Sequence, residues 1–286
     1  MKKILSFVAL TLSLGASLTL TGCNSSSSTN TKTISVCASD IPHAQILNGV
    51  VKNIVENQGY TLEVKTLDWT LQNDAVANKD YDANYFQHVP YLESYTGTTK
   101  LVATCKVHYE PLGIYQGKAT SLTNITSVEI CDDTSNAIRA LQLLQNKGII
   151  TGDLPIDKAG ENLTFSGKEW TSSNGIKVTL IAENLLASSR TDYDIACIPG
   201  NTALTANISL SLRLAVEDDA NQASLKANVL AVRHDDYLND ASYKAKIDVL
   251  TDALLSKDTK DYVNQYYNGM VRCDSSTQID LRSSIK

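Results

Sequence analysis

The sequence predicts an α/β protein built from two lobes, and three observations lead to this expectation. From residue 32 onward, runs rich in β-branched residues alternate with runs that carry apolar residues at helical spacing. This alternation is typical of largely parallel sheets covered by helices. It occurs in two series of similar size, and a late strand-like run follows the second series. We therefore expect two α/β lobes, with the C-terminus returning to the first.

The first series predicts a strand, a helix, a strand, a second helix, and then one or two strands interrupted at Pro111. Gly59 ends the first helix, and the second helix has a polar face. This order fits one right-handed β-α-β layer. The expected elements are residues 33–39, 43–59, 60–68, 70–86 and 100–117.

The second series begins with a strand that leads into a helix, and either Thr134 or Ser135 can cap that helix. Two further short strands follow, separated from the helix by a stretch rich in Gly, Ser and Asn that predicts mostly loop. A late strand and two closing helices complete the chain. The corresponding residues are 127–133, 134–149, 154–175 (loop), 177–184, 194–201, 226–236 and 241–269.

The N-terminus predicts export and lipid anchoring. "MKK" followed by "ILSFVALTLSLGASL" is a basic region before an apolar region, the layout of a signal peptide. The run is too short and too rich in Ser and Thr for a membrane-spanning helix of about 20 apolar residues. "LTGC" ending at Cys23 is similar to a bacterial lipobox, the alternative being an ordinary Cys. We expect a signal peptide at 1–22, lipidation of Cys23, a flexible tether at 23–32 and an extracytoplasmic location.

Charge and cysteine content exclude several classes of function. The formal charge of −6 becomes −8 without residues 1–22, and no cluster of Lys and Arg appears, so nucleic acid is not an expected partner. Besides Cys23, five cysteines are scattered without a C-x-x-C pair, so no disulfide framework is indicated, although one bridge is possible. Cys105 and His108 lack a second ligand pair, and we expect neither a metal nor a cofactor.

Residues 81–92, "YDANYFQHVPYL", gather Phe86, His88 and Tyr91 in a chain with only three Phe and four His. Such a cluster looks like a surface that contacts another molecule. Ordinary core aromatics and a structural histidine are the alternative interpretation. No motif of a serine hydrolase, zinc protease or nucleotide-binding enzyme is present, so we do not expect an enzyme.

Four segments together resemble the NlpA/MetQ lipoprotein family, whose members are methionine-type substrate-binding proteins of ABC importers. The resemblance covers about residues 34–269, with the segments in the family's order. It implies a type II periplasmic-binding-protein-like fold, in which two crossover strands join two α/β lobes around a ligand cleft. The segments are "DANYFQHVPYL" at 82–92, "HYEPLGIY" at 108–115, "SNAIRALQLLQNKGII" at 135–150 and "DIACIPGN" at 194–201.

The resemblance implies ligand-binding residues in both lobes. In the first lobe, Phe86, His88 and Tyr91 match the family's wall for the ligand side chain, and Trp69 falls where the family commonly has Tyr. In the second lobe, the family's Asn-x-x-Arg places an Arg against the ligand carboxylate, and two further Asn contact the polar end of the ligand. The matching residues here are Asn136, Arg139, Asn201 and Asn228.

Elementary chemistry is compatible with these roles. Arg presents a planar set of donors that pairs with a carboxylate, and Asn136 and Arg139 are three residues apart, on one face of a helix near its N-terminus. That end of a helix also favours an anion. Exposed Arg on a helix face is the alternative interpretation, as are turn or strand-edge roles for Asn201 and Asn228.

The family pattern also implies lobe boundaries and partners. Lobe 1 would comprise residues 33–112 and 225–286, and lobe 2 residues 113–224, with hinge segments near 111–115 and 217–227. The implied partners are a membrane permease and a ligand, methionine or a related amino acid, and we expect a monomer. The alternative function is a surface adhesin or a short-peptide binder on the same scaffold.

Three departures from the family pattern bear on the ligand. Trp69 adds bulk to the side-chain wall. "CDDTSN" replaces the commoner Pro-Asn-Asp-Pro-Thr-Asn and brings Cys131 and Asp132 toward the site, where an added carboxylate favours a ligand with an extra positive group. The family's Pro-Arg pair is missing, because residues 187–189 are "ASS". The identity of the ligand therefore stays open.

Overall fold

A computed structural model describes residues 32–217, 220–267 and 269–286. The expected signal peptide, Cys23 and nearly all of the tether lie outside these residues. No helix within the described ranges has the length and apolar character needed to cross a membrane.

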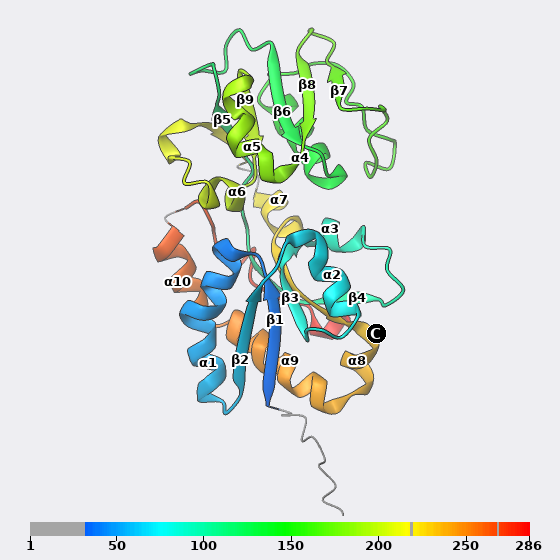
Figure 1. The fold of residues 1–286 in the computed structure, drawn as a ribbon, viewed down its shortest axis with the longest axis vertical. Coiled ribbons are helices and arrows are strands. Elements are labelled where there is room, and N and C mark those ends of the chain that lie inside the picture. Colours follow the sequence, from blue (N-terminus) through cyan, green and yellow to red (C-terminus); the bar gives the residue numbers. More distant parts are fainter. Residues whose placement is uncertain (1–31, 218–219, 268) are drawn as a thin grey trace, which may run out of the picture. The chain divides into compact units, whose positions relative to one another are not determined.

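The strands form two six-stranded sheets (Figure 1). The first sheet has the order β12, β4, β11, β3, β1, β2, and the second has the order β10, β5, β9, β6, β8, β7. The first sheet takes its strands from both ends of the described chain and the second from the middle, so the chain passes between the sheets twice. The strands are β1 Thr33–Ala38, β2 Thr61–Thr66, β3 Ala83–His88, β4 Leu101–His108, β5 Gly113–Gln116, β6 Ser127–Cys131, β7 Glu169–Thr171, β8 Lys177–Ile181, β9 Ile195–Ile198, β10 Arg213–Val216, β11 Asn228–Arg233 and β12 Ile279–Asp280.

Each sheet has its own apolar core. Residues of β1, β3 and β11 pack with helices α1, α9 and α10 in the first core, and residues of β6, β8 and β9 pack with α4 in the second. Burial of such side chains contributes roughly 25 cal/mol per Å² of apolar surface. The helices are α1 Lys52–Asn57, α2 Trp69–Ala77, α3 Val89–Glu93, α4 Thr134–Asn146, α5 Glu183–Ser189, α6 Gly200–Thr205, α7 Ala220–Leu225, α8 His234–Asn239, α9 Ala241–Leu254 and α10 Lys257–Tyr267, with short η1 Asp40–Ala44, η2 Leu47–Val51, η3 Arg190–Asp192, η4 Leu210–Leu212 and η5 Arg282–Ser284.

The parallel strands of both sheets direct their carboxyl ends toward the candidate site. β1 pairs in parallel with β2 and β3, and β6 pairs in parallel with β8 and β9. The sheets are nevertheless mixed, because β11 runs antiparallel to β3 and β4, and β5 runs antiparallel to β9 and β10. The expectation of largely parallel sheets is therefore correct only for β2, β1 and β3 in the first sheet and for β8, β6 and β9 in the second.

The expected helix at residues 70–86 is wrong in its second half. The helix α2 ends at Ala77, Lys79 adopts a positive φ of 69°, and residues 83–88 form β3, which is buried along its whole length. Polar residues occupy this strand because they bond to one another. Asn84 donates to the Asn73 side chain at 2.9 Å, and Gln87 donates to Asn84 at 2.8 Å. In the sequence, the polar residues of such a buried network cannot be told apart from polar residues on an exposed surface.

Smaller differences have local causes. Asp133, and neither Thr134 nor Ser135, caps α4, because its carboxylate accepts the backbone N–H of Asn136 at 3.0 Å. The stretch expected as mostly loop contains the edge strand β7, which pairs with β8. The five cysteines in the described residues are unpaired thiols.

Candidate functional site

All eight residues that the resemblance singles out line one pocket. Of those from the first sheet, four follow or end the parallel strands β2 and β3, whereas Asn228 begins the antiparallel strand β11; those from the second sheet lie just beyond β6 and β9. Ligands of α/β proteins bind at this edge, beyond the carboxyl ends of parallel strands. The pocket has a free volume of about 50 Å³, whereas a single water needs roughly 10–15 Å³. The eight residues are Trp69, Phe86, His88, Tyr91, Asn136, Arg139, Asn201 and Asn228.

Three aromatic side chains form one side of the pocket. Trp69 begins α2, where the carboxylate of Asp68 caps the helix by accepting the Thr70 N–H at 2.9 Å. The rings of Trp69 and Tyr91 meet edge to face with centroids 5.4 Å apart, and those of Phe86 and Tyr91 are 5.8 Å apart. Edge-to-face contacts fix the ring orientations, so this group is a preformed surface. We call Trp69, Phe86 and Tyr91 the aromatic wall.

His88 connects the first sheet to α4. It caps α3, because its Nδ1 accepts the backbone N–H of Tyr91 at 3.2 Å. Its Nε2 therefore carries the hydrogen and donates to Oδ1 of Asn136 at 3.3 Å. Burial and, to a smaller extent, the nearby positive charge of Arg139 lower the pKa of His88 to about 4. The imidazole is thus neutral at physiological pH.

Arg139 is buried and already holds a carboxylate of this chain. Its Nε donates to both carboxylate oxygens of Glu217 at 2.8 Å, and its Nη2 donates to the Glu110 carbonyl at 2.7 Å. Glu217 follows β10 and Glu110 precedes β5, so Arg139 joins α4 to both chain crossings. The hydrogen bonds of Arg139 to the described residues use Nε and Nη2, and none of them uses Nη1. The Nε–Nη2 edge of the guanidinium therefore already holds Glu217, and Nη1 is the nitrogen left for a ligand carboxylate.

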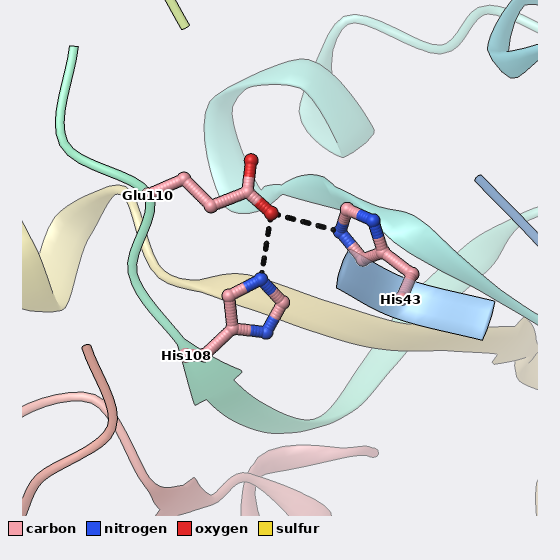
Figure 2. Close-up of side chains that lie close together, drawn as sticks. All are labelled: His43, His108 and Glu110. Atoms are coloured by element: carbon pink, nitrogen blue, oxygen red, sulfur yellow. Dashed lines mark hydrogen bonds and ion pairs between the residues drawn. The ribbon is translucent and has the colours of Figure 1, made fainter. Parts of the chain in front are cut away.

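A buried group of His43, His108 and Glu110 lies beside the pocket (Figure 2). One carboxylate oxygen of Glu110 is 2.7 Å from Nε2 of His108 and 3.3 Å from Nε2 of His43. Nε2 of His43 also lies 3.0 Å from Oδ1 of the pocket residue Asn228. Tyr85 hydrogen-bonds Nδ1 of His108. The group thus connects the first sheet's interior to the pocket, because Glu110 itself lines the pocket.

Burial controls protonation in this group. It lowers the pKa of His43 to about 4 and that of His108 to about 3, so both imidazoles are neutral near pH 7. The pKa of Glu110 is raised by burial, against the opposing effects of His43 and Arg139. A ligand cation placed beside Glu110 would favour its ionised form. Glu110 is therefore an acceptor suited to an ammonium group.

A second acid, Glu183, also lines the pocket, from the segment that follows β8. It begins α5, and its carboxylate accepts the Thr202 hydroxyl at 2.6 Å. The thiol of Cys131 lies between Asp133, at 2.9 Å, and Glu183, at 3.9 Å. Burial raises the pKa of Glu183 to about 7, and the charges of Asp133 and Glu110 add to this effect. Asp132, which the sequence brought toward the site, is exposed and does not line the pocket.

Sequence reasoning missed five lining residues. Glu110 lies inside the quoted segment "HYEPLGIY", so its position after a strand and before Pro111 was a usable signal. Gln87 and Pro199 also lie inside quoted segments, "DANYFQHVPYL" and "DIACIPGN". Ser39 and Glu183 follow strands as single residues without a motif, and only the paired sheets bring them to the pocket. The missed residues are Ser39, Gln87, Glu110, Glu183 and Pro199.

Comparisons with known proteins agree with the resemblance. The model of the NlpA lipoprotein family matches residues 34–272. The methionine-binding lipoprotein MetQ of Bacillus subtilis is 32% identical over 259 residues, which cover 87% of this chain and 91% of that protein.

Solved structures of similar proteins extend this agreement to the fold. A lipoprotein from Ruminococcus gnavus is 37% identical, with a TM-score of 0.75 over 85% of this chain and all of that one. A nutrient-binding protein from Burkholderia cenocepacia, solved bound to methionine, is 28% identical, with a TM-score of 0.73 over 84% of this chain and 99% of that one. These matches confirm the predicted two-lobed α/β fold. The chain belongs to the NlpA lipoprotein family.

Proposed function

We propose that this protein is a lipid-anchored, extracytoplasmic binding protein of an ABC importer that captures an amino acid, most closely methionine, and delivers it to a permease. The observation that carries the proposal is the convergence of all eight family positions on one pocket that joins an aromatic wall to charged groups. The methionine-binding relatives support it. Its role is binding and transport, without chemistry on the ligand.

The pocket offers a partner for each part of an α-amino acid. The thioether packs against the aromatic wall, since sulfur is polarizable and favours ring edges. The ammonium group meets Glu110 and the side-chain oxygen of Asn228. The carboxylate meets Nη1 of Arg139 near the N-terminus of α4, where the helix dipole adds a small attraction.

Closure of two lobes would complete this site. We assign residues 33–112 and 225–286 to lobe 1 and residues 113–224 to lobe 2, in keeping with the sheet to which each strand belongs. Bonds such as that from His88 to Asn136 connect the two lobes. A ligand that contacts both lobes favours the closed arrangement over the open one. The hinge would lie in the crossings, near residues 111–115 and 217–227.

Calorimetric titration tests the proposed function. The protein is purified in detergent, unfolded and refolded to remove bound ligand, and titrated with L-methionine, D-methionine and the other common amino acids. We expect a saturable heat with methionine, unchanged in a Glu56→Gln variant, because Glu56 lies on α1 and pairs only with the surface residue Lys52 among the ion pairs described. An absence of heat with every amino acid would reject the proposal and favour an adhesin.

One observation favours a second candidate, the binding of a short peptide. A larger cavity of about 860 Å³ adjoins the pocket and shares Tyr91 and Arg139 with it. Lys106 and Lys226 also line this cavity, so they could meet the terminal carboxylate of a peptide. Methionine-containing dipeptides belong in the same titration, and tighter binding of a dipeptide than of methionine would favour this candidate.

Lipid anchoring depends on Cys23, and its substitution should release the protein. Acyl chains on this residue bind a membrane by about 0.8 kcal/mol for each buried methylene. We therefore expect a Cys23→Ser variant to lose the radiolabelled palmitate. It should appear either as a processed protein in the soluble fraction or as a precursor that keeps its signal peptide. A matched Cys37→Ser variant should stay in the membrane fraction, because Cys37 is a buried residue of β1. Retention and labelling of the Cys23→Ser protein would contradict acylation at this site.

A further inference from the structure

The charged residues that line the pocket are two acids and one base. They are Glu110, Glu183 and Arg139, and the guanidinium of Arg139 is already neutralised by Glu217 at 2.8 Å. A methionine zwitterion brings one ammonium and one carboxylate, which Glu110 and Arg139 can accommodate. Methionine then has no second positive group that could pair with Glu183.

Glu183 lines the same small pocket as the aromatic wall. Tyr91 belongs to that wall, and its pKa is raised to about 12 by burial and by the charges of Asp133 and Glu183. The carboxylate of Asp133 is filled by local bonds, from the Cys131 thiol, the Ser135 hydroxyl and the Asn136 amide groups. Glu183 accepts only the Thr202 hydroxyl and a long contact from Cys131 among the described residues. Its carboxylate therefore has capacity for a ligand group at the aromatic wall.

An uncharged thioether gives this carboxylate nothing in exchange for the water that closure removes, and such desolvation is costly. A positively charged ligand group between Glu183 and the aromatic wall would make two favourable interactions. It pairs with Glu183, and its charge is attracted to the faces of Trp69 and Tyr91, with Trp the strongest of the aromatic partners. A methylated cation suits this place best, because its surface is apolar and it needs no hydrogen-bond acceptors of its own.

We infer that the preferred ligand of this pocket is an amino acid whose side chain ends in a methylated cation, such as a sulfonium, held between the aromatic wall and Glu183. This inference rests on the proposed function and narrows its ligand class. Glu183 and Trp69 are its specificity-determining residues.

The test compares L-methionine with S-methyl-L-methionine, which differs by one methyl group and one positive charge. Both are titrated calorimetrically into full-length protein in detergent at pH 8, after refolding to remove bound ligand. We expect the sulfonium to bind about tenfold more tightly or better. The ratio of the two dissociation constants is the readout, because partial misfolding of a variant lowers both affinities alike.

Two variants and one control test which residues cause the preference for the sulfonium over methionine. Glu183→Gln should bring the ratio close to one, and Trp69→Leu, which keeps an apolar wall but removes the ring, should lower it. Glu169→Gln is the matched control, since Glu169 is an exposed acid of lobe 2 paired with Lys177, and its ratio should equal that of the wild type.

The outcomes separate this inference from the proposed function. Methionine binding as tight as or tighter than that of the sulfonium overturns the inference and leaves the proposed function standing. A preference for the sulfonium that survives Glu183→Gln also overturns it, because the selecting charge then lies elsewhere. Failure of both compounds and of every other amino acid overturns the proposed function as well.

Discussion

Replacement of Arg139 by alanine is expected to lower the free energy of unfolding by about 3–5 kcal/mol, because it leaves the buried carboxylate of Glu217 without its main partner. The loss should lie toward the lower end, since Lys226 also approaches Glu217 at 3.4 Å. The same change should weaken amino-acid binding by about 100-fold or more, because it removes the cation that we assign to the ligand carboxylate. Urea unfolding and calorimetric titration measure the two effects.

A matched control and a double variant separate stability from binding. Arg233 is also buried and pairs with Asp236 at 2.6 Å, but it lies outside the pocket, so Arg233→Ala should destabilise the protein while the folded fraction keeps its affinity. Combining Arg139→Met with Glu217→Gln removes both charges and should recover stability without recovering binding. Full affinity in either Arg139 variant would exclude Arg139 as a ligand contact.

The ion pair between Arg139 and Glu217 makes the free energy of unfolding depend on pH, and the sign of this dependence follows from the pKa of Glu217. Burial opposes ionisation of Glu217, but Arg139 and Lys226 outweigh it and lower the pKa from 4.5 to about 2. A carboxylate with a lowered pKa in the folded state contributes stability above pH 4.5 and loses it as the pH falls through 2. This lowered pKa contributes about 3 kcal/mol to the free energy of unfolding at neutral pH, because each pKa unit corresponds to about 1.4 kcal/mol. Arg139→Ala should remove most of this acid sensitivity.

Glu110→Gln is expected to weaken methionine binding by about 100-fold while changing stability little. The amide keeps the size of the side chain but removes the negative charge that we assign to the ligand ammonium, and a hydrogen-bonded buried charge pair contributes about 2–5 kcal/mol to binding. Stability should hold, since burial already disfavours the ionised carboxylate in the empty pocket. Calorimetric titration and thermal melting measure the two quantities.

Glu129→Gln is the matched control for this prediction. Glu129 is another buried acid, on β6, and burial raises its pKa to about 7, but it bonds Ser189 and does not line the pocket. Its substitution should leave affinity unchanged. If Glu110→Gln and Glu129→Gln bind methionine equally well, the ammonium group does not contact Glu110.

The strand β3 shows where a sequence pattern misleads. Asn84 lies in the second half of the expected helix and Gln87 just after it, and the turn after Ala77 is not marked by Gly or Pro. In the structure both side chains are buried and bond to each other and to Asn73, eleven and fourteen residues earlier. Polar residues that satisfy one another inside the protein carry the same sequence pattern as solvated ones.

The residues of the candidate site also fall into two groups, those that sequence motifs predict and those that only the structure reveals. Phe86, His88, Tyr91, Asn136 and Arg139 lie in compact motifs, and their shared pocket could be expected before the structure was known. Glu110 lies in a quoted segment but carries no motif of its own, and nothing local distinguishes Glu183 from a surface residue. Their importance comes from burial and from neighbours that are distant in sequence.

The sequence alone determined the α/β class, the family and the residues that converge on one pocket, because periodicity, order of segments and local motifs are carried by neighbouring residues. Only the tertiary structure decided that Glu217 is already paired with Arg139, that His43 and His108 contact Glu110, and that Glu183 lines the same pocket as the aromatic wall. These contacts join residues from separate strands. The charge balance of the pocket, and with it the class of ligand, depends on which buried charges meet, and that depends on how the two sheets are assembled.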